Sequence, residues 1–307
     1  MDQEEGDLRF CMNNAGNGDT ITFQVGGSVQ LNSPLLPITQ GNLTINGGAW
    51  YPTINENGAE QTGSIFTINP GASASIQNLY IIGGLADNGG AINNFGALSL
   101  VDDWITNNVA TQEGGGIYNN TSGSITLQDV SIGENSAQYG GGISSGGSIT
   151  SSTMGDGSSI YKNTAAWDGG GILNWGNMNL NGENIFGNTA RSGSGGGVAN
   201  YGSGASFTLY GNGSFYSLYN NVAGLYGGGL YNQANAYLEG VQVEINSAYQ
   251  GGGIFLGSTS TTTLDSVTVN SNYTKTVAPG IAYLSGANMN FTSVTDSDDP
   301  GGNPVEV

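Results

Sequence analysis

A glycine-rich motif recurs along most of the chain at intervals of 24 to 32 residues. Each copy is a short glycine run, Gly-Gly-Ala in the first copy and Pro-Gly in the last, followed by an aliphatic residue. The aliphatic residues are Ile92, Ile117, Ile143, Ile172, Val198, Leu230, Ile254 and Ile281. A low-complexity disordered chain would not place its aliphatic residues periodically, so the 55 glycines indicate a structural repeat.

A second motif, Asn-x-Ala, lies upstream of most glycine runs. Its copies begin at Asn108, Asn135, Asn163, Asn188, Asn221 and Asn246, with a looser copy at Asn272. Two short runs of alternating polar and apolar residues separate the motifs, as at 124–127, and this period predicts short strands. A unit of this length is too short for a strand, a crossover helix and a second strand. We therefore predict an all-β fold, a single-stranded right-handed parallel β-helix of about ten coils.

The whole chain, 1–307, is expected to form one domain, because a solenoid has no separate cores. Residues 5–17 are predicted to form an N-terminal cap, 18–295 the coils, and 296–307 a polar tail or linker. Asp7 suits a helix N-cap, and Leu8, Cys11 and Met12 fall on one helical face. A short amphipathic helix would therefore cover the open first coil.

Polar residues occupy the position two after each of the six aliphatic anchors from Ile92 to Leu230. They are Asn94, Asn119, Ser145, Asn174, Asn200 and Asn232. Asparagine amides on successive coils can hydrogen-bond to one another, so the five asparagines are predicted to form a structural ladder at one corner.

The charge balance excludes several functions. Lys and Arg number 4 against 23 Asp and Glu, a net charge of −19, so no basic face for nucleic acid is available. Histidine is absent and Cys11 is the only cysteine, which excludes histidine catalysis and an intrachain disulfide framework. No apolar run is long enough for a transmembrane helix, and acidic residues follow Met1 where a signal peptide would be basic.

The paired repeat resembles that of the chlamydial polymorphic outer membrane proteins and of related right-handed β-helix proteins of bacterial surfaces. The segments 104–107 (WITN) and 186–188 (FGN) approximate the second element of that repeat, and the opening at 7–10 (DLRF) is similar to the start of such proteins. The resemblance covers about residues 7–290 and implies a secreted or surface-displayed passenger that acts in adhesion.

Solenoids of this kind also resemble pectate lyases and other polysaccharide-degrading enzymes, which use clustered carboxylates. Glycoside hydrolysis requires two carboxyl groups about 5 to 10 Å apart. Acidic residues follow a strand in most coils, and Asp102, Asp103 and Asp129 are the catalytic candidates of this alternative. The alternative is that these acidic residues occupy solvated turns and have no catalytic role. No metal site and no cofactor are expected; the same row offers oxygen ligands for Ca²⁺, but no calcium-binding loop motif is present.

Aromatic residues supply the candidate binding surface. Those in the loops before the glycine runs are Tyr139, Trp167, Tyr226 and Tyr249, and those near the aliphatic anchors are Tyr118, Tyr231 and Trp175. Alternation with the inward anchor predicts that Tyr118 and Tyr231 point outward. Exposed rings beside Asn amides suit a sugar or protein ligand, whereas rings stacked along the rod would only cover backbone. The hydroxyl-rich run 258–263 suggests ice binding, but no Thr-x-Thr pair recurs in every coil.

The function predicted from these features is a non-enzymatic extracellular or cell-surface module, either adhesive or structural. Its partner would be a protein or glycan on a host or neighbouring cell, bound through repeated weak contacts. The sequence is compatible with assembly into homo-oligomers or into end-to-end fibres. The alternative is a polysaccharide lyase or glycoside hydrolase.

Overall fold

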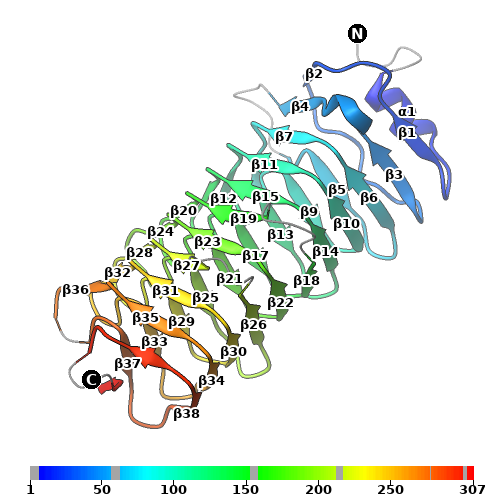
Figure 1. The fold of residues 1–307 in the computed structure, drawn as a ribbon. Helices are drawn as coiled ribbons and strands as arrows, with labels where there is room; N and C mark the ends of the chain where they lie inside the picture. Colours follow the sequence, from blue (N-terminus) through cyan, green and yellow to red (C-terminus); the bar gives the residue numbers. More distant parts are fainter. Residues whose placement is uncertain (1–6, 57–62, 153–157, 212–216, 277, 300–302) are drawn as a thin grey trace.

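The computed structural model describes residues 7–56, 63–152, 158–211, 217–276, 278–299 and 303–307. These residues form a right-handed parallel β-solenoid of about ten turns, as predicted, with α1 (Leu8–Asn14) at one end and β38 (Asn288–Thr292) at the other (Figure 1). A single 3₁₀ turn, η1, spans Gly48–Trp50. Residues 5 and 6 of the predicted cap lie outside the described residues.

Four parallel sheets, named A to D, surround the core. Sheet A contains β1 (Thr20–Thr22), β3 (Leu43–Asn46), β6 (Ser73–Gln77), β10 (Ala97–Val101), β14 (Ser124–Gln128), β18 (Ser148–Ser151), β22 (Asn177–Asn181), β26 (Ser206–Tyr210), β30 (Asn235–Glu239), β34 (Thr261–Asp265) and β38. Sheet B contains β2 (Ser28–Leu31), β4 (Thr53–Glu56), β7 (Tyr80–Ile82), β11 (Trp104–Thr106), β15 (Ser131–Gly133), β19 (Ser159–Tyr161), β23 (Asn184–Phe186), β27 (Leu218–Tyr219), β31 (Gln242–Glu244), β35 (Thr268–Asn270) and β39 (Thr295–Asp296).

In the other two sheets most strands begin directly after the glycine run or directly after the Asn of the two sequence motifs. Sheet C, which holds the glycine motif, contains β5 (Phe66–Ile68), β9 (Ile92–Asn94), β13 (Ile117–Asn119), β17 (Ile143–Ser145), β21 (Ile172–Asn174), β25 (Val198–Asn200), β29 (Leu230–Asn232), β33 (Ile254–Leu256), β37 (Ile281–Tyr283) and β40 (Val305–Glu306). Sheet D, which holds Asn-x-Ala, contains β8 (Leu85–Asn88), β12 (Val109–Glu113), β16 (Ser136–Ala137), β20 (Thr164–Ala165), β24 (Thr189–Ala190), β28 (Val222–Ala223), β32 (Ser247–Ala248) and β36 (Tyr273–Thr274).

The core is a set of aliphatic stacks that run along the rod. In sheet A, Leu98 pairs in register with Ile125, and Ile125 with Ile149, and all three side chains are buried. The aliphatic anchors of the glycine motif, from Ile92 to Ile281, are fully buried in sheet C. Each such side chain contributes about 1.5–3 kcal/mol on burial, so this one continuous core holds the turns together.

The N-terminal helix caps the first turn as expected. The carboxylate of Asp7 accepts a hydrogen bond from the backbone N–H of Phe10 at 2.6 Å, and Leu8 and Met12 are buried against the core. Cys11 is partly buried against the same core. Arg9 fastens the helix to the next loop, because its guanidinium donates to the carbonyls of residues 33 and 34, both at 2.6 Å.

The glycine runs are required where neighbouring backbones approach closely. A Cβ on Gly141 would collide with the carbonyl of Gly170 and with the backbone of Thr164, which belongs to β20. Gly140, directly before it, has a φ of +60°, a conformation that glycine adopts without a Cβ penalty.

The C-terminal segment, predicted as a tail or linker, contributes to the last turn. Asp296 belongs to β39, and β40 pairs with β37. Asp298 accepts hydrogen bonds from the backbone N–H and the amide of Asn272, at 2.9 and 2.8 Å. Asp299 accepts from the backbone N–H of Ile281 at 2.8 Å. These carboxylates take the positions that carbonyl oxygens of a further turn would otherwise occupy.

Candidate functional site

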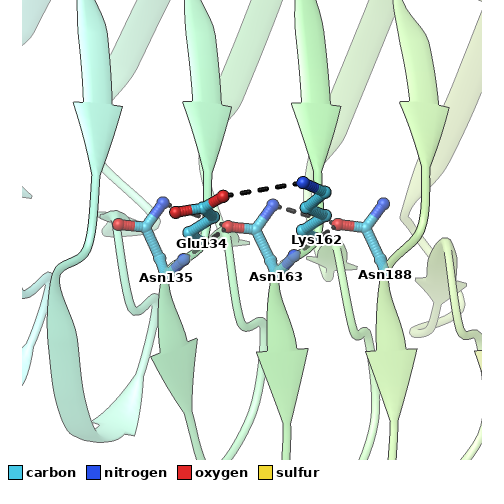
Figure 2. A network of polar contacts seen from close by, with 5 residues as sticks. All are labelled: Glu134, Asn135, Lys162, Asn163 and Asn188. Carbon is cyan, nitrogen blue, oxygen red and sulfur yellow. Dashed lines mark hydrogen bonds and ion pairs between the residues drawn. The ribbon is translucent and has the colours of Figure 1, made fainter.

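The asparagines of the Asn-x-Ala motif form a continuous internal ladder between sheets B and D. Figure 2 shows three of them, Asn135, Asn163 and Asn188, whose amides lie side by side on successive turns. Each amide donates to the next asparagine at 3.0 Å and to a sheet B carbonyl, and each oxygen also accepts the preceding asparagine's backbone N–H. The members are Asn108, Asn135, Asn163, Asn188, Asn221, Asn246 and Asn272. Because all seven satisfy buried main-chain groups, the motif is structural.

The asparagines that follow the glycine motif lie at a second buried corner, between sheets C and A. Asn94 donates to Asn119, and Asn119 to the hydroxyl of Ser145, at 2.8 and 3.0 Å. Asn174, Asn200 and Asn232 form a second run, with amide contacts of 2.8 Å. All of these side chains are fully buried, so they are unavailable to a ligand.

The acidic residues do not form a single stripe. Asp102 and Asp129 occupy a left-handed corner with φ of 53°, whereas Asp103 lies one position later and is fully buried. The Asp103 carboxylate accepts from the backbone N–H groups of Leu79 and Val101, at 2.9 and 3.2 Å. Burial, reinforced by the charge of Asp102, raises the pKa of Asp103 well above its usual range. Asp156, another member of the expected row, lies outside the described residues.

Glu183 is the second buried carboxyl of this corner. It is 2% exposed, and burial raises its pKa to about 7, with the charge of Asp129 adding to the effect. A hydrogen bond with Ser151 opposes the shift. Asp103 and Glu183 have the raised pKa of a general acid, but neither side chain is accessible to a substrate.

The predicted aromatic residues fall into separate registers instead of one line. Among the loop residues, Trp167 and Tyr249 occupy one register and are 49% and 46% exposed. Tyr139 and Tyr226 occupy the next register and are half-buried. Near the anchors, Tyr118 is half-buried, Trp175 is 52% exposed, and Tyr231, which was expected to be exposed, retains only 6% exposure.

Tyr231 is buried because other rings cover the outer side of sheet C. Trp175 stacks on Tyr201 with ring centroids 5.1 Å apart, Tyr201 contacts Tyr231 at 5.2 Å, and Tyr226 contacts Phe255 at 4.5 Å. We call these five residues the aromatic patch; they belong to turns that follow one another along the rod. Trp175 is its exposed end, and Tyr231 and Phe255 are its interior.

A carboxylate lies beside this patch. Asp168 accepts the backbone N–H of Ser194 at 2.7 Å and forms a side-chain hydrogen bond with Tyr201. Burial, together with the charge of Asp168, raises the pKa of Tyr201, and burial is also the main reason why the pKa of Tyr231 is raised to about 12. Both phenols are therefore neutral hydrogen-bonding groups near pH 7. Asp168 was missed in the sequence because no repeat links it to the aromatic residues.

A second surface missed in the sequence is the outer face of sheet A. Its strands pair in register from β1 to β38, and two rows of outward side chains run along them. The first row is Ser73, Ala97, Ser124, Ser148, Asn177, Ser206, Asn235, Thr261 and Asn288. The second row is Thr20, Thr44, Ser75, Ser99, Thr126, Thr150, Asn179, Thr208, Tyr237, Thr263 and Asn290. A Thr-x-Thr repeat is absent from the sequence because Ser and Asn stand in place of Thr in most of these strands.

Charged contacts are few on this rod. Within the described ranges the structure contains one ion pair, between Lys162 and Glu134 at 3.8 Å, which lies on the surface beside the asparagine ladder (Figure 2). Exposed pairs of this kind contribute little to stability. No three acidic or cysteine side chains within the described ranges converge on a point where a metal ion could be held. Likewise, no helix in the described part of the chain has the length and apolarity needed to cross a bilayer.

Comparisons with known protein families, with curated proteins and with solved structures find no match to this chain.

Proposed function

We propose that the chain is a non-enzymatic extracellular or cell-surface module of the adhesive type, as in the surface passengers that its repeats resemble. The observation that carries the proposal is the aromatic patch, a set of rings that extends over successive turns and ends in the half-exposed indole of Trp175. No cofactor is invoked.

The patch has the chemistry of a contact surface for a glycan or protein on another cell. The indole of Trp175 offers an apolar face, and Asp168 and Tyr201 beside it supply hydrogen-bonding groups. Rings that are held by stacking lose little conformational freedom on binding, which favours their use as anchors. One patch would bind weakly, and several rods on one surface would add their contacts through avidity.

The buried acids argue against the enzymatic alternative. The two carboxyls with raised pKa at the predicted catalytic corner are 0% and 2% exposed, so a polysaccharide cannot approach them. Asp103 instead holds two backbone N–H groups, which is a structural task. Asp102 and Asp129 lie on neighbouring turns at the half-exposed outer corner, and the acids with a raised pKa near them, Asp103 and Glu183, are buried.

The test is a glycan array and a cell-adhesion assay combined with a polysaccharide-degradation screen on the same purified chain. We expect binding without release of reducing or unsaturated ends, and we expect Trp175→Ala to weaken it. Trp50→Ala is the matched control, because Trp50 is 59% exposed but lies near the other end of the rod. Polysaccharide cleavage that is abolished by Asp103→Asn would overturn the proposal, and so would equal binding by the two tryptophan variants.

A further inference from the structure

The two rows on sheet A form a regular lattice of small polar groups. Along the rod, in-register strands repeat at about 4.8 Å, and residues two apart within a strand repeat at roughly 6.6 Å. Eighteen of the twenty positions are Ser, Thr or Asn, the exceptions being Ala97 and Tyr237. None of the twenty side chains is buried. The solenoid therefore presents hydrogen-bonding groups at two fixed repeat distances over most of its length.

The lattice is uncharged, although the protein as a whole is strongly acidic. Neither row contains Asp, Glu, Lys or Arg; the nearest acids on these strands, Glu239 and Asp265, lie two residues beyond the second row. Ser99, Thr126 and Thr150 form no side-chain hydrogen bond within the described part of the chain, so their hydroxyls are available to solvent. A neutral hydroxyl does not impose the tight hydration shell of an ion, and it can both donate and accept.

A trough lies between the two rows over four neighbouring strands of the N-terminal half. It has a volume of about 330 Å³, with Ser73, Ser75, Ser124 and Thr126 among its walls. A trough of this size has room for several water molecules between the two rows. The wall formed by Thr44, Ser75, Ser99 and Thr126 carries a hydroxyl on every strand, whereas Ala97 interrupts the facing wall, so waters along the first wall would repeat at the strand interval.

From these observations we propose that the outer face of sheet A binds the surface of an ice crystal. The strand spacing of the lattice is close to one of the two oxygen repeats on the prism face of hexagonal ice. Waters ordered by the hydroxyl rows would join the crystal as part of its outer layer. Because the stacked ladders keep the rows in place, little further ordering of the protein is needed on binding.

A crystalline polysaccharide is the other repeating surface to consider, and this face fits it less well. Flat glycan sites use aromatic rings as platforms, and Tyr237 is the one ring in the two rows. The rings of this rod gather instead on sheet C, in the aromatic patch. The ice proposal is therefore independent of the adhesive function, which depends on Trp175.

The experiment measures thermal hysteresis, ice-crystal shape and inhibition of ice recrystallisation with the full chain. We expect activity in the wild type and its loss in the double variant Thr126→Lys, Thr150→Lys, since two ammonium groups would disturb the ordered water. Thr106→Lys, Thr268→Lys is the matched control, because both threonines point outward on sheet B. A second pair on the same face, Asn179→Lys, Thr208→Lys, repeats the test if the first variant folds poorly, as judged by circular dichroism.

Several outcomes overturn the inference. One is the absence of ice shaping and hysteresis in the wild type; another is equal loss in the sheet A and sheet B variants. Binding to microcrystalline cellulose or chitin that disappears with Thr126→Lys, Thr150→Lys, in the absence of ice activity, would assign the face to a glycan. Trp175→Ala should leave ice activity unchanged, because Trp175 follows β21 of sheet C and is not part of sheet A. The ice proposal can therefore hold even if the adhesive proposal fails.

Discussion

The side-chain oxygen of Asn163 accepts two hydrogen bonds from Asn135, one from its backbone N–H and one from its amide, both at 3.0 Å. The Asn163 amide in turn donates to Ile132 and to Asn188, also at 3.0 Å. One side chain thus connects three turns of the solenoid at a fully buried corner.

Replacing Asn163 with Ala is expected to lower the free energy of unfolding by about 3 to 5 kcal/mol, because it leaves several buried donors and acceptors unsatisfied at about 1–3 kcal/mol each. Chemical denaturation would measure the loss, and hydrogen exchange would localise it to the neighbouring turns. Asn179→Ala, at an exposed position of sheet A, should change stability by less than about 0.5 kcal/mol. Similar losses in both variants would contradict a structural role for the ladder.

The last turn provides a second test at Asp298, which accepts both hydrogen bonds of Asn272. Asp298→Asn keeps an oxygen acceptor and should leave stability and amide exchange nearly unchanged. Asp298→Ala removes it, and we expect faster amide exchange in β36 and β37 because a partly buried N–H loses its partner. Unchanged exchange in Asp298→Ala would show that this carboxylate does not close the ladder.

Stability should fall as pH rises, and Glu183 is one measurable source. Burial raises its pKa from 4.5 to about 7 in the folded chain. Below about pH 4.5 Glu183 is protonated in both the folded and the unfolded chain. Between about pH 4.5 and 7 it stays protonated only in the folded chain, so the free energy of unfolding falls as pH rises, and above about pH 7 the decrease is complete. The difference amounts to a loss on the order of 3 kcal/mol.

Glu183→Gln removes this titration. Denaturation at about pH 5 and about pH 8 should show a smaller difference for the variant than for the wild type, with the variant more stable at the higher pH. Glu134→Gln, at an exposed site, controls for the loss of one charge. If Glu134→Gln flattens the pH dependence as much as Glu183→Gln, the effect comes from net charge and not from burial.

Close approach of backbones gives a further prediction at the glycine runs. Gly141→Ala places a methyl group against the carbonyl of Gly170, so we expect a loss of about 3 kcal/mol or more, or failure to fold. Gly204→Ala meets no atom within 4 Å and should be tolerated. Thermal unfolding of the two purified variants compares them directly, and equal midpoints would contradict the packing argument.

The repeat itself could be predicted from sequence because its physical cause is local. Inward aliphatic residues such as Ile117 and Ile143 must superpose, and crowded glycines must precede them, so both leave a period in the sequence. The cap at Asp7 was visible for the same reason, since its signal lies within one helical turn.

The surfaces could not be predicted in the same way, because they depend on pairing between turns. Trp167 and Tyr249 fall one register from Tyr139 and Tyr226, a difference that only the hydrogen bonds between loops reveal. The buried state of Tyr231 depends on rings from other turns. The lattice on sheet A could not be recognised as a sequence repeat because its positions hold Ser in some strands and Thr or Asn in others.

In both asparagine runs the hydrogen bonds between asparagine side chains all have one direction: the amide donates to the asparagine on the C-terminal side, as from Asn135 to Asn163 and from Asn174 to Asn200. The amide dipoles therefore add along the axis, as peptide dipoles do in a helix, and the positive end of the longer row meets the carboxylate of Asp298. The rod is an electrically polar object whose two ends differ even where its surface is neutral. Molecules of this protein in an electric field, or next to one another, have an inherent head and tail.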